Sequence, residues 1–330
     1  MNQYLRKLLP QSIFYWLKRR KYKLVLNREN RYQNHKLLHY SSTFLEDRNS
    51  TLATLNIMSH VLEKGITMPN RRYGFGYERV KEILILCNAI IQKYGAESVE
   101  LQSTIADLKQ YLDIHNEANF QLPVEIAEGI KVLLPYLRIM DDGNCYITTK
   151  SEFFKKTNDF AEFAMSRHSV RWYCNTPVEE RKLFAAIELA QTAPSACNRQ
   201  ATRVKVISSP ELKRMCCSMQ NGNRGFGDKA DKWLLITSEL GDWSHNYRFD
   251  PYLDAGIFTM NLLYSLHYYG IVACPLNAHL TTSQRDELQR RLGYPESEVP
   301  VVFITIGNPV DEFMVPRSRR LKIKDIIQVI

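Results

Sequence analysis

Apolar residues in the first half of the chain recur three or four positions apart, from about Phe44 to Asp141, as is typical of amphipathic helices. Gly65 and Gly95 stand where glycines commonly end helices. Few strand signals occur in this stretch, so it predicts a small all-α domain. Its four predicted helices cover about 52–64, 77–94, 97–114 and 124–134.

The second half mixes helical periodicity with short β-rich runs. Helices are predicted over about 152–165, 179–193 and 254–269, and strands over about 204–208, 233–237 and 299–306. The turn at Asp141–Asn144 separates the two patterns. The chain therefore predicts an arm over 1–40, a helical domain over 41–145 and an α+β domain over 146–330.

Composition places the chain among ordinary soluble globular proteins. It has 330 residues, of which 45% are apolar and 24% charged. Seven scattered cysteines form no CxxC pair, which favours a reducing, cytoplasmic compartment. Residues 1–36 hold ten Lys or Arg against one acid, which equals the formal net charge of +9 of the whole chain. The high net charge thus describes a basic N-terminal arm and not the body of the protein.

The arm is basic and apolar in places, but no apolar run reaches the roughly 18 residues of a membrane span. Two interpretations stay open: a basic amphipathic helix lying on anionic lipid at the inner face of the membrane, or an arm that packs on the body or on a partner subunit. No nucleic-acid-binding motif is present, so no nucleic-acid partner is expected. His35 and His39 have the spacing of a metal pair, but no third ligand is nearby, so no metal is expected.

The densest chemical signal is the segment Ser166–Tyr173, which reads SRHSVRWY. Two guanidiniums, an imidazole and a hydroxyl within five residues suit a phosphate group, because arginine presents forked donors that match its oxygens. A short basic run alone is more often solvated surface. Three further segments strengthen the signal, namely Ala193–Gln200, Asp254–Asn277 and Val315–Arg320.

Together these segments resemble the FMN-dependent nitroreductase family over about residues 159–330. The resemblance implies an α+β fold, an antiparallel-rich mixed sheet flanked by helices, and a homodimer with FMN at the interface. It assigns the FMN phosphate and the polar edge of the flavin ring to Arg167, His168, Ser169 and Arg171. It also assigns the phosphate to Arg317 and Arg319.

By the same resemblance, the loop after residue 193 reaches the flavin of the partner subunit. Its matching residues are Pro194, Ser195, Asn198 and Gln200, whereas Ala196 replaces a serine and Ala201–Thr202 replaces Pro-Trp. Asn223 corresponds to an asparagine that faces the pyrimidine ring. The segment Pro275, Leu276 and Asn277 corresponds to one that offers a backbone N–H to flavin N5, from Leu276 or Asn277.

The resemblance implies ping-pong chemistry, in which NADH or NADPH delivers hydride to the flavin and an electron-poor small molecule then takes the electrons. No side chain is assigned as an acid or base, because the cofactor carries the chemistry. Three alternatives stay open: an oxidative or fragmenting flavoenzyme such as a dehalogenating relative, a modifying enzyme of a bacterial surface-polysaccharide pathway, and a catalytically inactive binding module.

Overall fold

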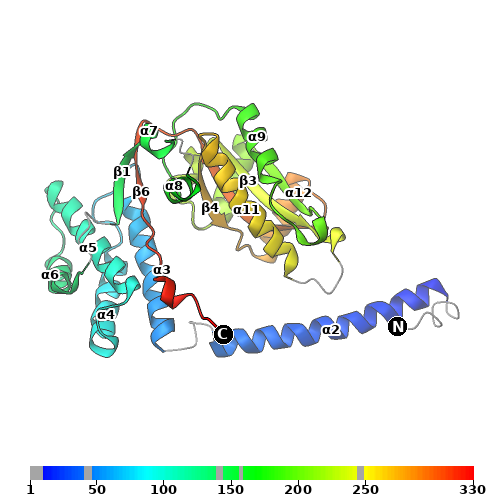
Figure 1. Cartoon of the computed structure of the whole chain (residues 1–330), viewed down its shortest axis with the longest axis horizontal. Coiled ribbons are helices and arrows are strands. Elements are labelled where there is room, and N and C mark those ends of the chain that lie inside the picture. The colour runs from blue at the N-terminus through cyan, green and yellow to red at the C-terminus, as the bar shows by residue number, and fades with distance from the viewer. Residues whose placement is uncertain (1–9, 41–46, 139–143, 156–158, 244–248) are drawn as a thin grey trace.

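The computed structural model describes residues 10–40, 47–138, 144–155, 159–243 and 249–330. It starts with a long helix, α2 (Gln11–Tyr40), that extends beside the rest of the molecule (Figure 1). Exposed apolar residues such as Ile13, Tyr15 and Val25 are distributed around this helix. The helix as a whole therefore has no single apolar face, unlike the amphipathic arm that the sequence suggests, although Ile13, Trp16 and Leu24 lie on the same side. The side chains of His35 and His39 lie outside the described part of the chain.

The four predicted helices of the first half are present. They are α3 (Arg48–Ile66), α4 (Tyr77–Tyr94), α5 (Val99–Glu117) and α6 (Val124–Leu133), which continues into the short 3-10 helix η1 (Leu134–Tyr136). Their apolar stripes meet in one core that includes Leu55, Ile83, Leu108 and Ile130, all fully buried.

Gly65 does not end its helix, contrary to the prediction. The α3 helix continues to Ile66, and Thr67 is its C-terminal cap residue. A Cβ atom on Gly65 would lie 2.2 Å from Cε2 of Phe75. Glycine is therefore needed there because an aromatic ring packs directly on the helix backbone.

The second half is built around a four-stranded sheet with strand order β2-β3-β5-β4 (Figure 1). The strands are β2 (Thr202–Ile207), β3 (Lys232–Glu239), β4 (Val272–Asn277) and β5 (Glu298–Gly307). Every described strand pair is antiparallel, so the parallel component of the predicted mixed sheet is not found among these residues. The α+β class itself is confirmed.

Helices cover both faces of this sheet. Leu234 and Ile236 of β3 pack in a core with α9 (Glu180–Ala190) and α11 (Asp250–Tyr268). Trp233 and Leu235 share a second core with α10 (Pro210–Met219) and α12 (Thr282–Leu292). Alternating side chains of one central strand thus serve two cores, which explains its unbroken apolar run.

A small second sheet links the two halves. In it, β1 (Cys145–Thr149) pairs with β6 (Glu312–Pro316). The sequence analysis predicted neither of these strands, nor α10. It also predicted one helix over about 152–165, where the structure has α7 (Lys150–Phe153) and α8 (Phe160–Ser166). Asp159 begins α8 anew, because its Oδ1 accepts a hydrogen bond from the backbone N–H of Ala161 at 2.7 Å.

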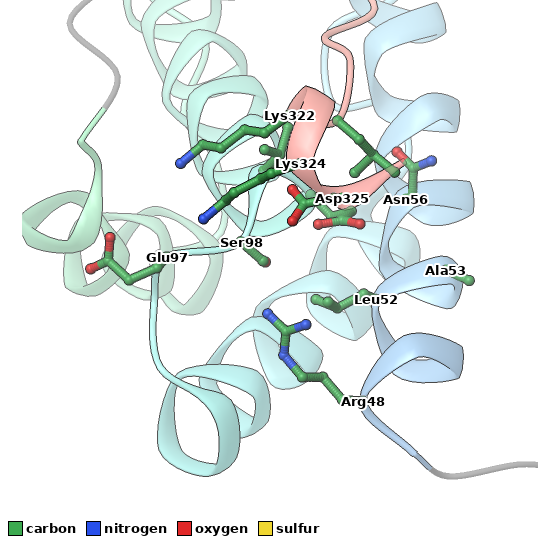
Figure 2. A pocket seen from close by; sticks show the side chains of 12 residues that line it. Arg48, Leu52, Ala53, Asn56, Glu97, Ser98, Lys322, Lys324 and Asp325 are labelled. Atoms are coloured by element: carbon green, nitrogen blue, oxygen red, sulfur yellow. The ribbon is translucent and has the colours of Figure 1, made fainter. Parts of the chain in front are cut away.

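Three short 3-10 helices, η2 (Ala196–Asn198), η3 (Gly227–Lys229) and η4 (Leu240–Asp242), lie in loops, and η5 (Ile323–Asp325) lies near the C-terminus. Between η5, α3 and the start of α5 is a groove of about 820 Å³. Figure 2 shows Lys322 and Lys324 extending from the C-terminal segment and Arg48 pointing up from the start of α3. The groove carries both signs of charge and contains none of the predicted site residues.

None of the described helices has the length and apolar character needed to cross a membrane.

Candidate functional site

The motif at residues 166–173 is fixed to the open edge of the large sheet. The helix α8 ends at Ser166, and the chain then runs beside β4, where the N–H of Val170 donates to the carbonyl of Ala273 at 3.0 Å. The hydroxyl of Tyr173 lies 2.8 Å from that of Thr305 on β5. These contacts hold the polar side chains of the motif in defined positions.

Arg171 is the most unusual residue of the motif. Only 6% of its surface is exposed, and its buried Nε and Nη1 atoms have no hydrogen-bond partner among the residues that the structure describes. Its guanidinium carbon lies 5.7 Å from the centroid of the Phe226 ring. A buried cation with two unsatisfied donors is costly, so this arrangement favours an anionic or strongly accepting group at the site. Arg171 therefore fits a bound anionic cofactor.

Arg167 and His168 lie close to the arginines of the C-terminal segment. Burial lowers the pKa of His168, and the nearby charges of Arg167, Arg320 and Arg317 lower it further. Burial also lowers the pKa of Arg167, with a further contribution from Arg320. Nε2 of His168 lies 3.2 Å from the Tyr146 hydroxyl. Arg167 and Arg317, which are 150 positions apart in the sequence, thus both lie near His168. Ser169, which is half-buried, lies in the sequence between the two arginines of the motif.

The two C-terminal arginines of the prediction have different surroundings. The guanidinium of Arg317 lies 4.8 Å from the centroid of the Tyr146 ring, next to His168. In contrast, Nε of Arg319 donates to Oδ1 of Asn144 at 2.6 Å. Ser318 has a left-handed backbone with a φ of 48°. Arg320, which the sequence analysis did not select, acts electrostatically on Arg167 and His168, because its charge lowers the pKa of both.

The ladder of β4 distinguishes between the two proposed backbone donors. The carbonyl of Ala273 points away from β5, because it accepts from Val170. In an antiparallel strand the side on which the N–H and carbonyl of a residue point alternates along the chain. The backbone groups of Pro275 and Asn277 therefore face the open edge, and the N–H of Leu276 faces β5. Asn277 is the better candidate donor.

Asn223 occupies a loop next to this edge. Its Nδ2 donates to the carbonyl of Cys217 at 2.9 Å and to that of Gln220, so its amide group shapes the loop. Gln220 connects the loop to β4, since its Nε2 donates to the carbonyl of Asn277 at 3.3 Å. A role for Asn223 toward a flavin stays a prediction.

The loop of Pro194, Ser195 and Gln200 lies apart from the motif in the single chain. The N–H of Ala196 donates to Oδ2 of Asp254 at 2.9 Å, and the N–H of Gln200 donates to the Ser195 hydroxyl at 3.1 Å. Gln200 has a positive φ of 51°, a conformation that costs free energy and that often marks functional loops. These residues border a cavity of about 460 Å³. The side chain of Asn198 is outside the described part.

The outer face of α11 connects the loop and the motif. An apolar stripe at helical spacing is solvent-exposed, by 62% at Leu253, 39% at Ile257, 37% at Met260 and 53% at Tyr268. Pro194 borders a groove along this stripe, together with Tyr264. Tyr264 also acts electrostatically on Arg167. The loop and the motif thus flank one exposed apolar face.

Parts of the chain are similar in sequence to known proteins. A sequence model of the Nitroreductase family matches residues 164–216, which include the motif and the loop. The C-terminal part of the chain is nitroreductase-like. The predicted resemblance is therefore confirmed for this part.

Curated relatives and a solved structure extend the likeness. An iodotyrosine deiodinase of Haliscomenobacter hydrossis is 26% identical over 198 residues, which cover 51% of this chain and 87% of that protein. An FMN reductase [NAD(P)H] of Bacillus subtilis is 24% identical over 170 residues, which cover 47% of this chain and 67% of that protein. A nitroreductase-type structure in complex with FMN from Exiguobacterium sibiricum shares 20% identity, covers 55% of this chain and 100% of that chain, and has a TM-score of 0.46.

Proposed function

We propose that the nitroreductase-like part is an FMN-dependent oxidoreductase that uses NADH or NADPH to reduce an electron-poor small molecule. The observation that carries this proposal is the buried Arg171 guanidinium, whose Nε and Nη1 have no hydrogen-bond partner in the described part of the chain. A built site for an anion, beside a cluster of further cations, fits a phosphorylated and redox-active cofactor. The relatives named for FMN and NAD(P)H support the same cofactors.

Different residues bind different parts of FMN. The phosphate accepts hydrogen bonds from Arg167, Ser169, Arg317 and Arg320, and Arg171 faces the polar edge of the ring. Asn277 offers a backbone N–H at the open edge of β4. His168 stays neutral at pH 7, because burial and three neighbouring arginines lower its pKa. It then acts as a hydrogen-bond partner and not as a further charge.

When bound, FMN accepts and donates hydride at its N5 atom. The chain itself contributes positioning and electrostatics. Buried cations favour the anionic form of the reduced flavin, which raises its reduction potential. NAD(P)H and the acceptor bind in turn to the same exposed side of the site, in a ping-pong order. No side chain is needed as an acid or base, because the cofactor carries the chemistry.

The exposed α11 stripe supports a homodimer with FMN at its interface. Burial of this stripe against a second copy removes apolar surface from water. It also brings the loop of Ser195 and Gln200 from one chain toward the motif of the other. The single chain keeps these two segments apart, so a second copy is needed to complete the site.

An absorbance spectrum of the purified protein tests the function. We expect a flavin spectrum that NADPH or NADH bleaches and that an electron-poor acceptor restores. Replacing Arg167 with Ala should weaken FMN retention about tenfold or more, because a charge-assisted hydrogen bond to phosphate is lost. A protein that stays colourless after addition of FMN would contradict the proposal and favour a binding module.

Reductive dehalogenation is a second candidate, favoured by the likeness to iodotyrosine deiodinases. The test is iodide release from iodotyrosine by the reduced protein. Release of iodide with slow turnover of nitro compounds would favour this activity over general reduction.

The basic arm is a separate part of the proposal. We expect α2 to contact an anionic membrane surface, because residues 1–36 carry ten basic residues and α2 exposes Ile13, Trp16 and Leu24. Co-sedimentation with anionic vesicles, lost after deletion of residues 1–36 and absent with neutral vesicles, tests it. Equal binding by the shortened chain would contradict it.

A further inference from the structure

The helical N-terminal region packs directly on the motif. Nε1 of Trp172 donates to the carbonyl of Thr67 at 2.7 Å, just after the end of α3. A Cβ atom on Gly225 would lie 2.6 Å from Cε of Met68. The end of α3 is therefore in contact with both the motif and the loop of residues 220–227.

Lys64, on the last turn of α3, reaches into this junction. Its Nζ donates to the carbonyl of Gly222 and lies 5.3 Å from the centroid of the Phe226 ring. Arg171 lies 5.7 Å from the same ring centroid. One aromatic ring is thus shared by two cations that come from the two halves of the chain.

The positive charges of Lys64 and Arg171 repel each other. Burial lowers the pKa of Lys64, and the neighbouring cations Arg171 and Arg224 lower it further. The nearby Cys274 thiol stays protonated at neutral pH, because burial raises its pKa. Two buried nitrogen atoms of Arg171 also have no hydrogen-bond partner among the described residues. Two desolvated cations side by side are unfavourable unless an anion lies between or beside them.

A chain of hydrogen bonds connects Lys64 to the open edge of β4. The carbonyl of Gly222 accepts from Lys64, and its N–H donates to Oε1 of Gln220 at 2.6 Å. Gln220 in turn donates to the carbonyl of Asn277 at 3.3 Å. Asn277 is the candidate donor for the flavin ring, whereas the phosphate candidates Arg317 and Arg320 are grouped around His168. Lys64 therefore belongs to the ring end of the site.

We propose that Lys64 is a binding residue of the flavin site, and that its ammonium group acts with Arg171 on the anionic edge of the reduced flavin ring. The helical N-terminal region is then part of the redox site and supplies one of its charges. This inference rests on the proposed FMN-dependent function.

The test compares Lys64→Met with wild type in three measurements: affinity for FMN, affinity for riboflavin, and the midpoint potential of bound FMN. We expect the ratio of affinities for reduced and oxidised FMN to fall about tenfold, which lowers the midpoint potential by about 30 mV for a two-electron couple. Lys64→Arg keeps the charge and should restore the potential. Lys131→Met, a change of an exposed lysine on α6, is the matched control.

Two outcomes would overturn the inference. An unchanged potential and unchanged affinities in Lys64→Met would show that Lys64 does not act on the flavin. A loss of FMN affinity with unchanged riboflavin affinity would assign Lys64 to the phosphate. If Lys64→Met does not fold, Lys64→Gln, which keeps a donor for the Gly222 carbonyl, replaces it. Wild-type protein that binds no FMN would contradict the proposed function itself, which is a different result.

Discussion

At the scale of single residues, buried polar groups without partners mark the site. Arg171 is held inside the protein by its neighbours, and its charge is not compensated by the atoms around it. Such a group destabilises the cofactor-free protein and becomes favourable when an anion binds. Removal of the Arg171 charge should therefore raise the stability of the cofactor-free protein and lower its affinity for FMN.

Arg171→Met tests this opposition. We expect the cofactor-free variant to be more stable than wild type by about 1–3 kcal/mol, because a buried unpaired charge is replaced by an apolar side chain. Added FMN should then raise its unfolding temperature less than that of wild type. Thermal unfolding with and without FMN measures both effects. The same change at Arg79 on α4, whose side chain is 47% exposed, serves as control. A less stable apo variant would argue against an uncompensated charge at Arg171.

His267 gives a prediction on pH. It is 5% exposed, its Nε2 lies 2.8 Å from the Ser166 hydroxyl, and burial followed by the charge of Arg167 lowers its pKa from 6.5 to about 4. Between these values the unfolded chain binds more protons than the folded protein. The free energy of unfolding therefore falls as the pH drops from 6.5 toward 4, by about 3 kcal/mol from this group.

Denaturant unfolding of wild type and His267→Gln at pH 7 and pH 4.5 measures the difference. The variant should lose less stability on acidification than wild type. Exposed His279, changed to Gln, should behave as wild type. Parallel pH profiles of wild type and His267→Gln would show that this imidazole is not the titrating group.

At the scale of elements, α3 and the motif form one unit. Trp172 belongs to the motif, and its indole N–H is bonded to the chain just after α3. Thr67, which supplies the acceptor, is 1% exposed, so water does not readily replace the indole. The contact couples the helical region to the strand edge that carries the candidate site.

Trp172→Phe removes this hydrogen bond and keeps an aromatic ring. We expect a loss of about 1–2 kcal/mol in the free energy of unfolding, because the Thr67 carbonyl is left without its donor. FMN affinity should fall as well, since the end of α3 carries Lys64. Trp16→Phe, on α2 where the indole is 57% exposed, is the matched control. Unchanged stability and affinity would mean that this contact does not couple the two halves.

At the scale of the whole molecule, the apolar stripe of α11 is the surface that a second copy would cover. It has helical spacing, is exposed along its length and lies between the motif and the loop of Ser195. Assembly and cofactor binding should therefore be coupled.

Ile257→Asp places a charge in the middle of this stripe. We expect light scattering to show a monomer where wild type is a dimer, and we expect the monomer to lose FMN. Ile85→Asp, at a position of α4 that is 72% exposed, makes the same change outside the stripe and should stay dimeric. A variant at Ile257 that is still dimeric and yellow would place the interface elsewhere.

The amino-acid sequence by itself determined most local elements. The helix of residues 77–94 has its predicted bounds, because its apolar stripe and the glycine after it act over short distances. The nitroreductase-like motif was also readable, because its side chains are dense and close in sequence. Phosphate donors that lie within a few residues of one another can be recognised without knowing which distant residues are in contact.

Only the tertiary structure decided which distant residues meet. It placed Phe75 on Gly65, paired β1 with β6, bonded Arg319 to Asn144, and brought the charge of Arg320 near Arg167. It also brought Lys64 beside Arg171 across 107 positions of sequence. Periodicity describes the faces of each element, whereas these contacts depend on how the two halves pack, and that packing has no local signature in the sequence.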